Sequence, residues 1–362
     1  MLNMFMFIII LLLVLMVFYV ETRFLKFGFI KKINNKLLMY LITLIPFVLI
    51  LVLFNYVNAV IIIFHLFIFF VIYGLIFFII KKLFNKKSKH YLVGYFAIFT
   101  TIIYLSIGAY LDYHIWETKY TLTTNKNISE NIRILQITDT HVGTTFDGDG
   151  LSSHFDKMKN IKPDIVVITG DFVDDDTTKE DMIKSVKALN KFETKYGIYF
   201  IYGNHDKGYF NYRNFTDSEL RSELMNNNIT ILEDQTMLIN DNFYLIGRKD
   251  KTMQRLSIEE LTKDLDKSKY IIDLNHQPND FENEKNAEVD LVLSGHTHGG
   301  QLFPLGYIGL LTKANDEFKG LHKRGNTTLI INTGMSDWAI DFKTGTKSEY
   351  TIIDIMKENN NE

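Results

Sequence analysis

The stretch IRILQITDTH at residues 132–141 decides the fold, because a short apolar run ends there in two polar side chains, Asp139 and His141. Six residues rich in Ile and Leu predict a buried β-strand over 132–137. Polar, helix-like stretches separate several similar runs, which predicts an α/β sheet with helices packed on its faces. The other predicted strands are Ile165–Ile168, Ile198–Tyr202, Ile271–Leu274, Leu291–Leu293 and Leu329–Ile331.

Polar side chains also follow four of the other runs. They are Asp171, the pair Asn204 and His205, His276, and the pair His296 and His298. Ligands of open α/β sheets bind at the carboxyl ends of strands, so these side chains are expected to meet although they span about 160 positions.

Each of these residues is a weak signal by itself. A lone Asp after a strand is usually a turn or cap residue, and a lone His is more often structural than a ligand. Together they form a set of nitrogen and oxygen donors in a chain without cysteine. Such a set favours divalent Mn, Fe, Zn or Ni over copper(I) or an iron–sulfur cluster.

The same residues form five motifs that resemble, in order, those of the calcineurin-like metallophosphoesterases. The resemblance covers the whole predicted domain at 132–362, and the segment Gly299-Gly300-Gln301 with the run after it is similar to the membrane-anchored bacterial branch of that family. Five separated motifs in one order are a specific signal, whereas any one alone is not. The motifs are Asp139-Thr140-His141, Gly170-Asp171-Phe172-Val173-Asp174, Gly203-Asn204-His205-Asp206, His276 and Gly295-His296-Thr297-His298.

The resemblance implies a four-layer αββα sandwich with two divalent metal ions, manganese among the candidates. It assigns Asp139, His141 and His298 to the first ion, Asn204, His276 and His296 to the second, and Asp171 to both. It implies hydrolysis of a phosphomonoester, diester or pyrophosphate by a metal-bridging hydroxide, without a covalent phosphoenzyme. His205 would be the catalytic acid and Asp206 would orient it. Asp174 would support the ligands from behind.

The residues before the predicted domain differ from it in charge and hydropathy. Residues 1–111 hold ten Lys and Arg and one acidic residue, a net charge of +9, whereas the rest of the chain carries −12. A content of 47% hydrophobic residues with no cysteine excludes a disordered chain and a disulfide scaffold. Four uncharged apolar runs predict four membrane-spanning helices: Met4–Val20, Leu37–Phe54, Ala59–Ile80 and Tyr91–Leu111.

The basic residues predict how these helices cross the membrane. They lie in the first and third loops, at 23–36 and 81–89, and the short second loop has none. By the positive-inside rule the first and third loops are cytoplasmic, so the amino terminus and everything after Leu111 are expected outside. The expected organisation is an anchor at 1–111, a linker at 112–131 and the metallophosphoesterase domain at 132–362.

These features predict a membrane-anchored phosphoesterase whose partners are the lipid bilayer and a phosphoester, the expected kind being lipid-linked. A catalytically idle membrane receptor or scaffold on the same fold is the alternative. A nuclease is disfavoured, because a charge of −12 opposes binding of nucleic acid. Residues 302–311 are uncharged over ten positions, and they form either a buried strand and turn or a membrane-facing lip. The helix expected at 217–226 and the acidic stretch 281–290 are both expected to be solvated faces.

Overall fold

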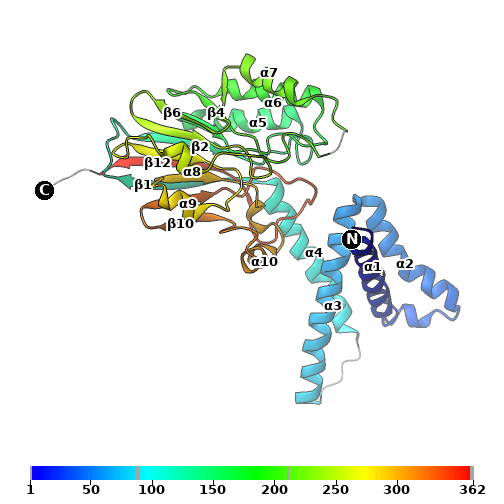
Figure 1. Ribbon diagram of the computed structural model, residues 1–362. Coiled ribbons are helices and arrows are strands. Elements are labelled where there is room, and N and C mark those ends of the chain that lie inside the picture. The colour runs from blue at the N-terminus through cyan, green and yellow to red at the C-terminus, as the bar shows by residue number, and fades with distance from the viewer. Residues whose placement is uncertain (1, 86–89, 210–211, 359–362) are drawn as a thin grey trace. The chain divides into compact units, whose positions relative to one another are not determined.

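The computed structural model describes residues 2–85, 90–209 and 212–358, with side chains from Ile10 onward. The chain divides into two compact units, Met1–Ala109 and Tyr110–Glu362 (Figure 1). The split in charge along the sequence predicts this division into two parts. The two units also differ in their secondary structure. The first consists of helices, and the second contains both β-sheets.

The first unit contains α1 (Leu2–Phe24), α2 (Lys36–Leu53), α3 (Tyr56–Phe84) and most of α4 (Leu92–Tyr113). Among the described residues, α2, α3 and α4 are long and apolar enough to cross a membrane. The expected first span falls on α1, whose opening side chains lie outside the described part of the chain. Three of the four expected spans therefore fall on helices that could cross a membrane.

The inside of the first unit is aromatic. Phe24 packs against Phe47 and Phe70, with ring centroids 5.7 and 5.9 Å apart. Helices α2 and α3 begin at Asn35 and Asn55, whose side chains accept hydrogen bonds from backbone N–H groups three residues on, as N-caps do. Many side chains of α2 and α3 are exposed and apolar, which suits a lipid environment rather than water.

The second unit contains two six-stranded sheets. In spatial order the first sheet is β1 (Ile115–Thr124), β12 (Ser348–Lys357), β2 (Ile132–Ile137), β3 (Ile165–Ile168), β4 (Ile198–Phe200) and β5 (Ile229–Ile231). The second sheet is β10 (Gly320–Arg324), β11 (Thr327–Ile331), β9 (Leu291–Ser294), β8 (Tyr270–Leu274), β7 (Phe243–Gly247) and β6 (Gln235–Ile239). All six strands expected from the sequence are present.

Helices cover the outer face of each sheet, which gives four layers (Figure 1). The outer face of the first sheet packs on α5 (Gly148–Met158), α6 (Lys179–Ala188) and α7 (Asp217–Asn226). The outer face of the second packs on α8 (Ile258–Thr262) and α9 (Phe281–Asn286). A third apolar core, with residues such as Ile134, Val167 and Ile272, fills the space between the sheets. The strands are apolar on both faces for this reason, and the αββα prediction is confirmed.

The linker expected at 112–131 is instead largely a strand. Strand β1 pairs in parallel with β12 along its whole length, from Ile115 opposite Ser348 to Thr124 opposite Lys357. The sequence Ile-Trp-Glu-Thr-Lys-Tyr-Thr-Leu-Thr-Thr alternates and is rich in β-branched and aromatic residues, which is the pattern of a half-buried strand. Its four Thr residues, together with Glu117 and Lys119, made it resemble a polar linker.

Candidate metal centre

The predicted site residues follow strands in both sheets. Asp139 and His141 follow β2, Asp171 follows β3, and Asn204 with His205 follows β4. The second sheet contributes His276 after β8 and His296 with His298 after β9. The strand ends therefore meet across the gap between two sheets, rather than along one edge of a single sheet.

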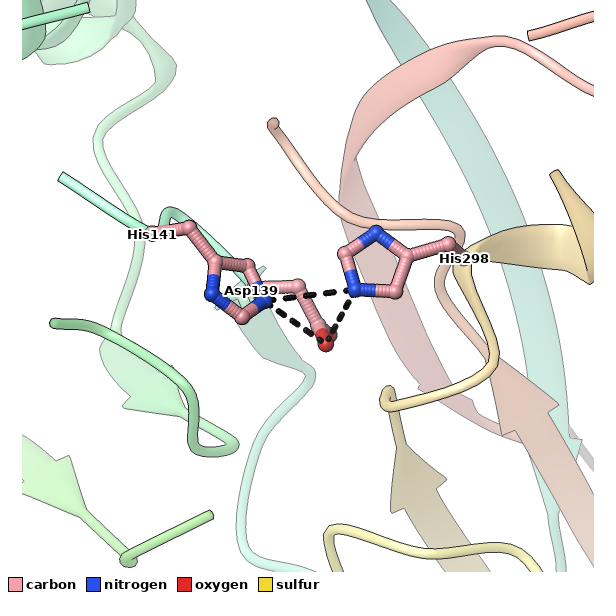
Figure 2. A group of neighbouring side chains, drawn as sticks. All are labelled: Asp139, His141 and His298. Atoms are coloured by element: carbon pink, nitrogen blue, oxygen red, sulfur yellow. Dashed lines mark hydrogen bonds and ion pairs between the residues drawn. The ribbon is translucent and has the colours of Figure 1, made fainter. Parts of the chain in front are cut away.

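Asp139, His141 and His298 form what we call the first ligand group, shown in Figure 2. Nε2 of His141 lies 3.2 Å from Nε2 of His298, which lies 3.4 Å from Oδ1 of Asp139. All three side chains are buried. Two imidazole nitrogens that face each other directly, beside a carboxylate, suit a shared cation.

Asp171, Asn204, His276 and His296 form the second ligand group. Nε2 of His276 lies 3.2 Å from both Oδ2 of Asp171 and Oδ1 of Asn204, and the rings of His276 and His296 are 5.1 Å apart. Oδ2 of Asp171 is also 3.8 Å from Nε2 of His141 in the first group. Asp171 thus lies between the two groups, where a bridging ligand is expected.

Hydrogen bonds of the Nδ1 atoms orient the histidines toward the centre. Nδ1 of His276 is 2.7 Å from the carbonyl oxygen of Thr169, and Nδ1 of His298 is 3.1 Å from that of Ser336. Nδ1 of His141 is 2.8 Å from a carboxylate oxygen of Asp174. Since a carbonyl only accepts, Nδ1 carries a proton, so in the neutral ring Nε2 is the nitrogen with a free lone pair. Nε2 atoms that converge on carboxylates in this way fit divalent metal ions, which take the place of any proton on Nε2.

The backbone at these ligands is unusual. Five ligands have φ in the left-handed region, between +37° and +70°: Asp139, His141, Asp171, His296 and His298. Non-glycine residues adopt this conformation at a cost, and such residues concentrate at functional sites. The tight turns after the strands thus aim both side chains of a pair such as His296 and His298 into one centre.

His205 is held beside the ligands by a different carboxylate from the expected one. Its Nδ1 is 3.0 Å from Oδ1 of Asp174, while the other oxygen of Asp174 pairs with His141. The carboxylate of Asp206 instead accepts four backbone N–H groups, those of Asp171, Phe172, Val173 and Gly203, at 2.7 to 3.1 Å. The expectation that Asp206 orients His205 thus differs from the structure, where Asp174 pairs with the ring and Asp206 joins two ligand loops.

Burial and charge divide the histidines into two kinds. Burial lowers the pKa of His296 to about 4 and that of His298 to about 3, so both stay neutral near pH 7. Burial also opposes protonation of His276, but Asp171 outweighs it and raises the pKa to about 10. For His141 the carboxylates of Asp174, Asp171 and Asp139 outweigh burial and raise the pKa to about 8.

Two buried acidic residues that the sequence did not single out support the first ligand group. Oδ1 of Asp337 lies 3.2 Å from Nδ1 of His298 and 3.7 Å from the ammonium nitrogen of the fully buried Lys343. The carboxyl group of Asp112, in the last turn of α4, is buried against Asp337. Asp112 and Asp337 lie 225 positions apart and neither follows a predicted strand, so no sequence signal connected them.

The acidic stretch 281–290 is not a solvated face throughout. Glu284 is buried, and its Oε1 lies 3.4 Å from a guanidinium nitrogen of the buried Arg248 and accepts a 2.7 Å hydrogen bond from Asn275. A buried carboxylate needs such partners. Asn275, the residue before the ligand His276, is thereby held in place by Glu284.

The geometry agrees with the comparisons with known proteins. The family model of the calcineurin-like phosphoesterases matches residues 132–300, which contain all five motifs. A metallophosphoesterase of Aquifex aeolicus is 32% identical over 211 residues, covering 56% of this chain and 77% of the relative. The chain belongs to the calcineurin-like metallophosphoesterase family.

Two further relatives are longer than the region they share with this chain. A metallophosphoesterase of Campylobacter jejuni is 30% identical over 236 residues, covering 63% of this chain and 60% of that protein. A transmembrane protein with a metallophosphoesterase domain from Danio rerio is 28% identical over 243 residues, covering 63% of this chain and 53% of that protein. This chain has helices that are long and apolar enough to cross a membrane, and the Danio rerio relative is named a transmembrane protein.

Proposed function

We propose that this protein is a membrane-anchored hydrolase that uses two divalent metal ions to cleave a phosphoester bond. One observation carries the proposal: Nε2 atoms of three histidines from two sheets converge on the carboxylates of Asp139 and Asp171, each held by an Nδ1 contact on its far side. A purely structural role for these histidines would not require their Nε2 atoms to face one another and two carboxylates.

The first ligand group would hold one ion and the second the other, with Asp171 shared. Two bound divalent ions lower the pKa of a water molecule toward neutrality and neutralise phosphoryl oxygens. The donors of both groups are nitrogen and oxygen, as Mn, Fe, Zn and Ni accept. Hydrolysis forms one bond from the water oxygen to phosphorus and breaks the bond from phosphorus to the leaving oxygen, which takes up a proton.

His205 is the residue placed to supply that proton. Its Nδ1 is committed to Asp174, so Nε2 is the nitrogen that it can offer to a leaving oxygen. The rings of Tyr209 and Trp338, both about half exposed, lie 4.9 and 6.2 Å from the His205 ring and flank the approach to it. Asp206 contributes by fixing the backbone of residues 171–173 and 203.

Metal analysis of the purified full chain in detergent, followed by a screen of phosphomonoesters, diesters and pyrophosphates, tests the proposal. We expect two ions per chain and turnover of one substrate class. Two ions without any turnover would favour the alternative, an idle receptor or scaffold, which His205 and the complete ligand set argue against. A chain that binds no divalent ion would contradict the proposed two-metal hydrolase.

We further propose that the catalytic unit lies outside the cytoplasm, on the strength of the basic residues in the first and third loops. Reporter fusions after Leu111 and at Lys86, in the basic segment 81–89, should give opposite signals. A cytoplasmic signal after Leu111 would reverse the topology. The substrate that suits this location is a phosphoester of a lipid or an envelope-linked molecule, because the anchor raises its effective concentration.

A further inference from the structure

An apolar surface lies on the chain between the metal ligands and the carboxyl-terminal strands. Residues 302–311 form a loop and α10 (Leu305–Leu311), not a buried strand. Five large side chains on it are exposed, with 60% of Phe303 and 84% of Leu311 accessible. The other three are Leu305, Tyr307 and Ile308. An uncharged segment that exposes five such side chains is unusual at a surface facing water.

The buried residue of α10 is a small one, Gly306. A Cβ atom on Gly306 would lie 2.4 Å from the ring of Phe318, and one on Gly300 would lie 2.4 Å from the backbone of Gly306. Glycine is therefore needed at both positions for α10 to pack against Phe318 and Gly300. In an ordinary surface helix the large apolar residues face inward and polar residues face out. Helix α10 has the opposite arrangement, which indicates that its outer face meets something apolar.

The loop before α10 is bound to a segment that adjoins the end of α4. The backbone N–H of Phe303 donates to the hydroxyl of Thr344, and the N–H groups of Thr344 and Gly345 donate to the carbonyl of Gln301. Thr344 and Gly345 also line a cavity of about 700 Å³ together with Leu111, in the last turns of α4. The loop before α10 is thus hydrogen-bonded to a segment that lies beside the last turns of α4, a helix long enough to cross a membrane.

Charged and aromatic groups at the same place suit a membrane interface. Lys319 and Lys347 line that cavity, and the Lys347 ammonium lies 5.4 Å from the centroid of the Trp116 ring. Tyr110 and Tyr113 on α4 are exposed. Tyr and Trp are enriched at the level of lipid headgroups, and Lys there attracts anionic lipids.

We propose that Phe303, Leu305, Tyr307, Ile308 and Leu311 insert into the lipid leaflet from which α4 emerges, so that α10 is an interfacial helix. Seven residues are too few to span a bilayer, but they suffice to lie in its surface. Insertion itself does not depend on catalysis. Its use, which rests on the proposed function, is to bring the phosphate of a membrane-embedded substrate to the metal ligand His298, seven positions before Leu305.

The absence of cysteine from the chain allows a direct test. Single variants Leu305→Cys and Leu311→Cys, labelled with a polarity-sensitive fluorophore, are placed in lipid nanodiscs at one chain per disc. Met225→Cys on α7, equally exposed to solvent, is the matched control. We expect blue-shifted emission and at least twofold quenching by nitroxide-labelled lipids at 305 and 311, and neither effect at 225.

Two outcomes would overturn the proposal. Quenching at 305 and 311 by aqueous iodide but not by nitroxide lipids would show that α10 faces water. A blue shift seen only at two chains per disc would show that the surface binds a second copy of the chain instead.

The functional use has its own test. Leu311→Glu should lower turnover of a phosphoester embedded in the bilayer by at least tenfold and leave turnover of a soluble phosphoester unchanged. Equal turnover of the embedded substrate by both proteins would remove the functional use. If the parent protein cleaves no phosphoester, the proposed function fails while the fluorescence result on α10 stands.

Discussion

The first ligand group is enclosed, whereas the second is open to solvent at two residues. Asp139, His141 and His298 are buried, while Asn204 and His296 are each partly exposed. The histidines of the first group contact side-chain carboxylates, those of Asp174 and Asp337. In the second group, Nδ1 of His276 contacts a backbone carbonyl instead. Carboxylate partners make an imidazole a stronger ligand. We therefore expect the first group to hold its ion more tightly and the second to be the more accessible to a substrate.

The largest effect is expected at the residue that belongs to both groups. Asp171→Asn removes a charge shared by the two groups, so both ions should be lost together and activity should fall below detection. Metal content and turnover of the purified variant check this. Asp290→Asn is the control. Asp290 directly precedes β9, whereas His296 follows the other end of that strand, and the carboxylate of Asp290 pairs with Lys126. Retention of one full ion by the Asp171 variant would show that the groups are independent.

His205 lies beside both groups but is expected to hold neither ion. His205→Ala should therefore keep two ions per chain and lose a factor of about 10² to 10⁴ in turnover, the usual contribution of a general acid. Metal analysis and kcat of the same preparation decide the matter. If this variant lost as much metal as Asp171→Asn, His205 would be a ligand instead.

The carboxylate behind His298 should separate the two groups. Asp337→Asn keeps the shape of the side chain but removes its charge, so the ion of the first group should bind about 10- to 100-fold more weakly while the second is unaffected. Asn204→Ala should give the reverse. Titration of the metal-free variants by calorimetry resolves the two binding steps. Equal weakening of both steps in either variant would contradict the division into groups.

The smallest expected effect is the dependence of metal affinity on pH. In the metal-free chain the pKa values of His141 and His276 are raised to about 8 and 10, so both are protonated at pH 7 and must lose their protons to bind a metal. Each group should therefore release about one proton, and affinity should rise about tenfold per pH unit for each ion. His296 and His298, with pKa values of about 4 and 3, should release none.

Calorimetry in two buffers of different ionisation enthalpy counts these protons. Four protons at pH 7 would mean that His296 and His298 are also charged. None would mean that the carboxylates do not hold His141 and His276 in their protonated form.

The sequence predicted the strands that end at the site better than the surroundings of the site. Motifs such as Asp139-Thr140-His141 lie directly after short apolar runs, so local pattern places them at strand ends. The pairing of His298 with Asp337, and of Asp337 with Asp112, depends on packing between distant segments, which no local pattern records. Asp206 was expected to orient His205 because it is adjacent in sequence, yet its carboxylate points into the backbone of a neighbouring loop.

Strand β1 escaped prediction for a related reason. Half of its side chains face solvent, so its composition resembles that of a linker, and its partner β12 lies more than 200 residues further along the chain. Alternation was the available signal. Without knowledge of the partner strand, alternation in a polar segment is weak.

The central position of β12 has a consequence for how the protein is made. It lies between β1 and β2, so the first sheet cannot close until residues 348–357 have left the ribosome. At about 5 to 20 residues per second, β2 waits about 10 to 40 s for this partner. The ligand-bearing loop at Asp139 is hydrogen-bonded to the late segment at Met335 and Ser336, so the metal centre also matures late. If the centre binds ions as proposed, we expect it to take them up from the compartment in which the folding of this unit is completed.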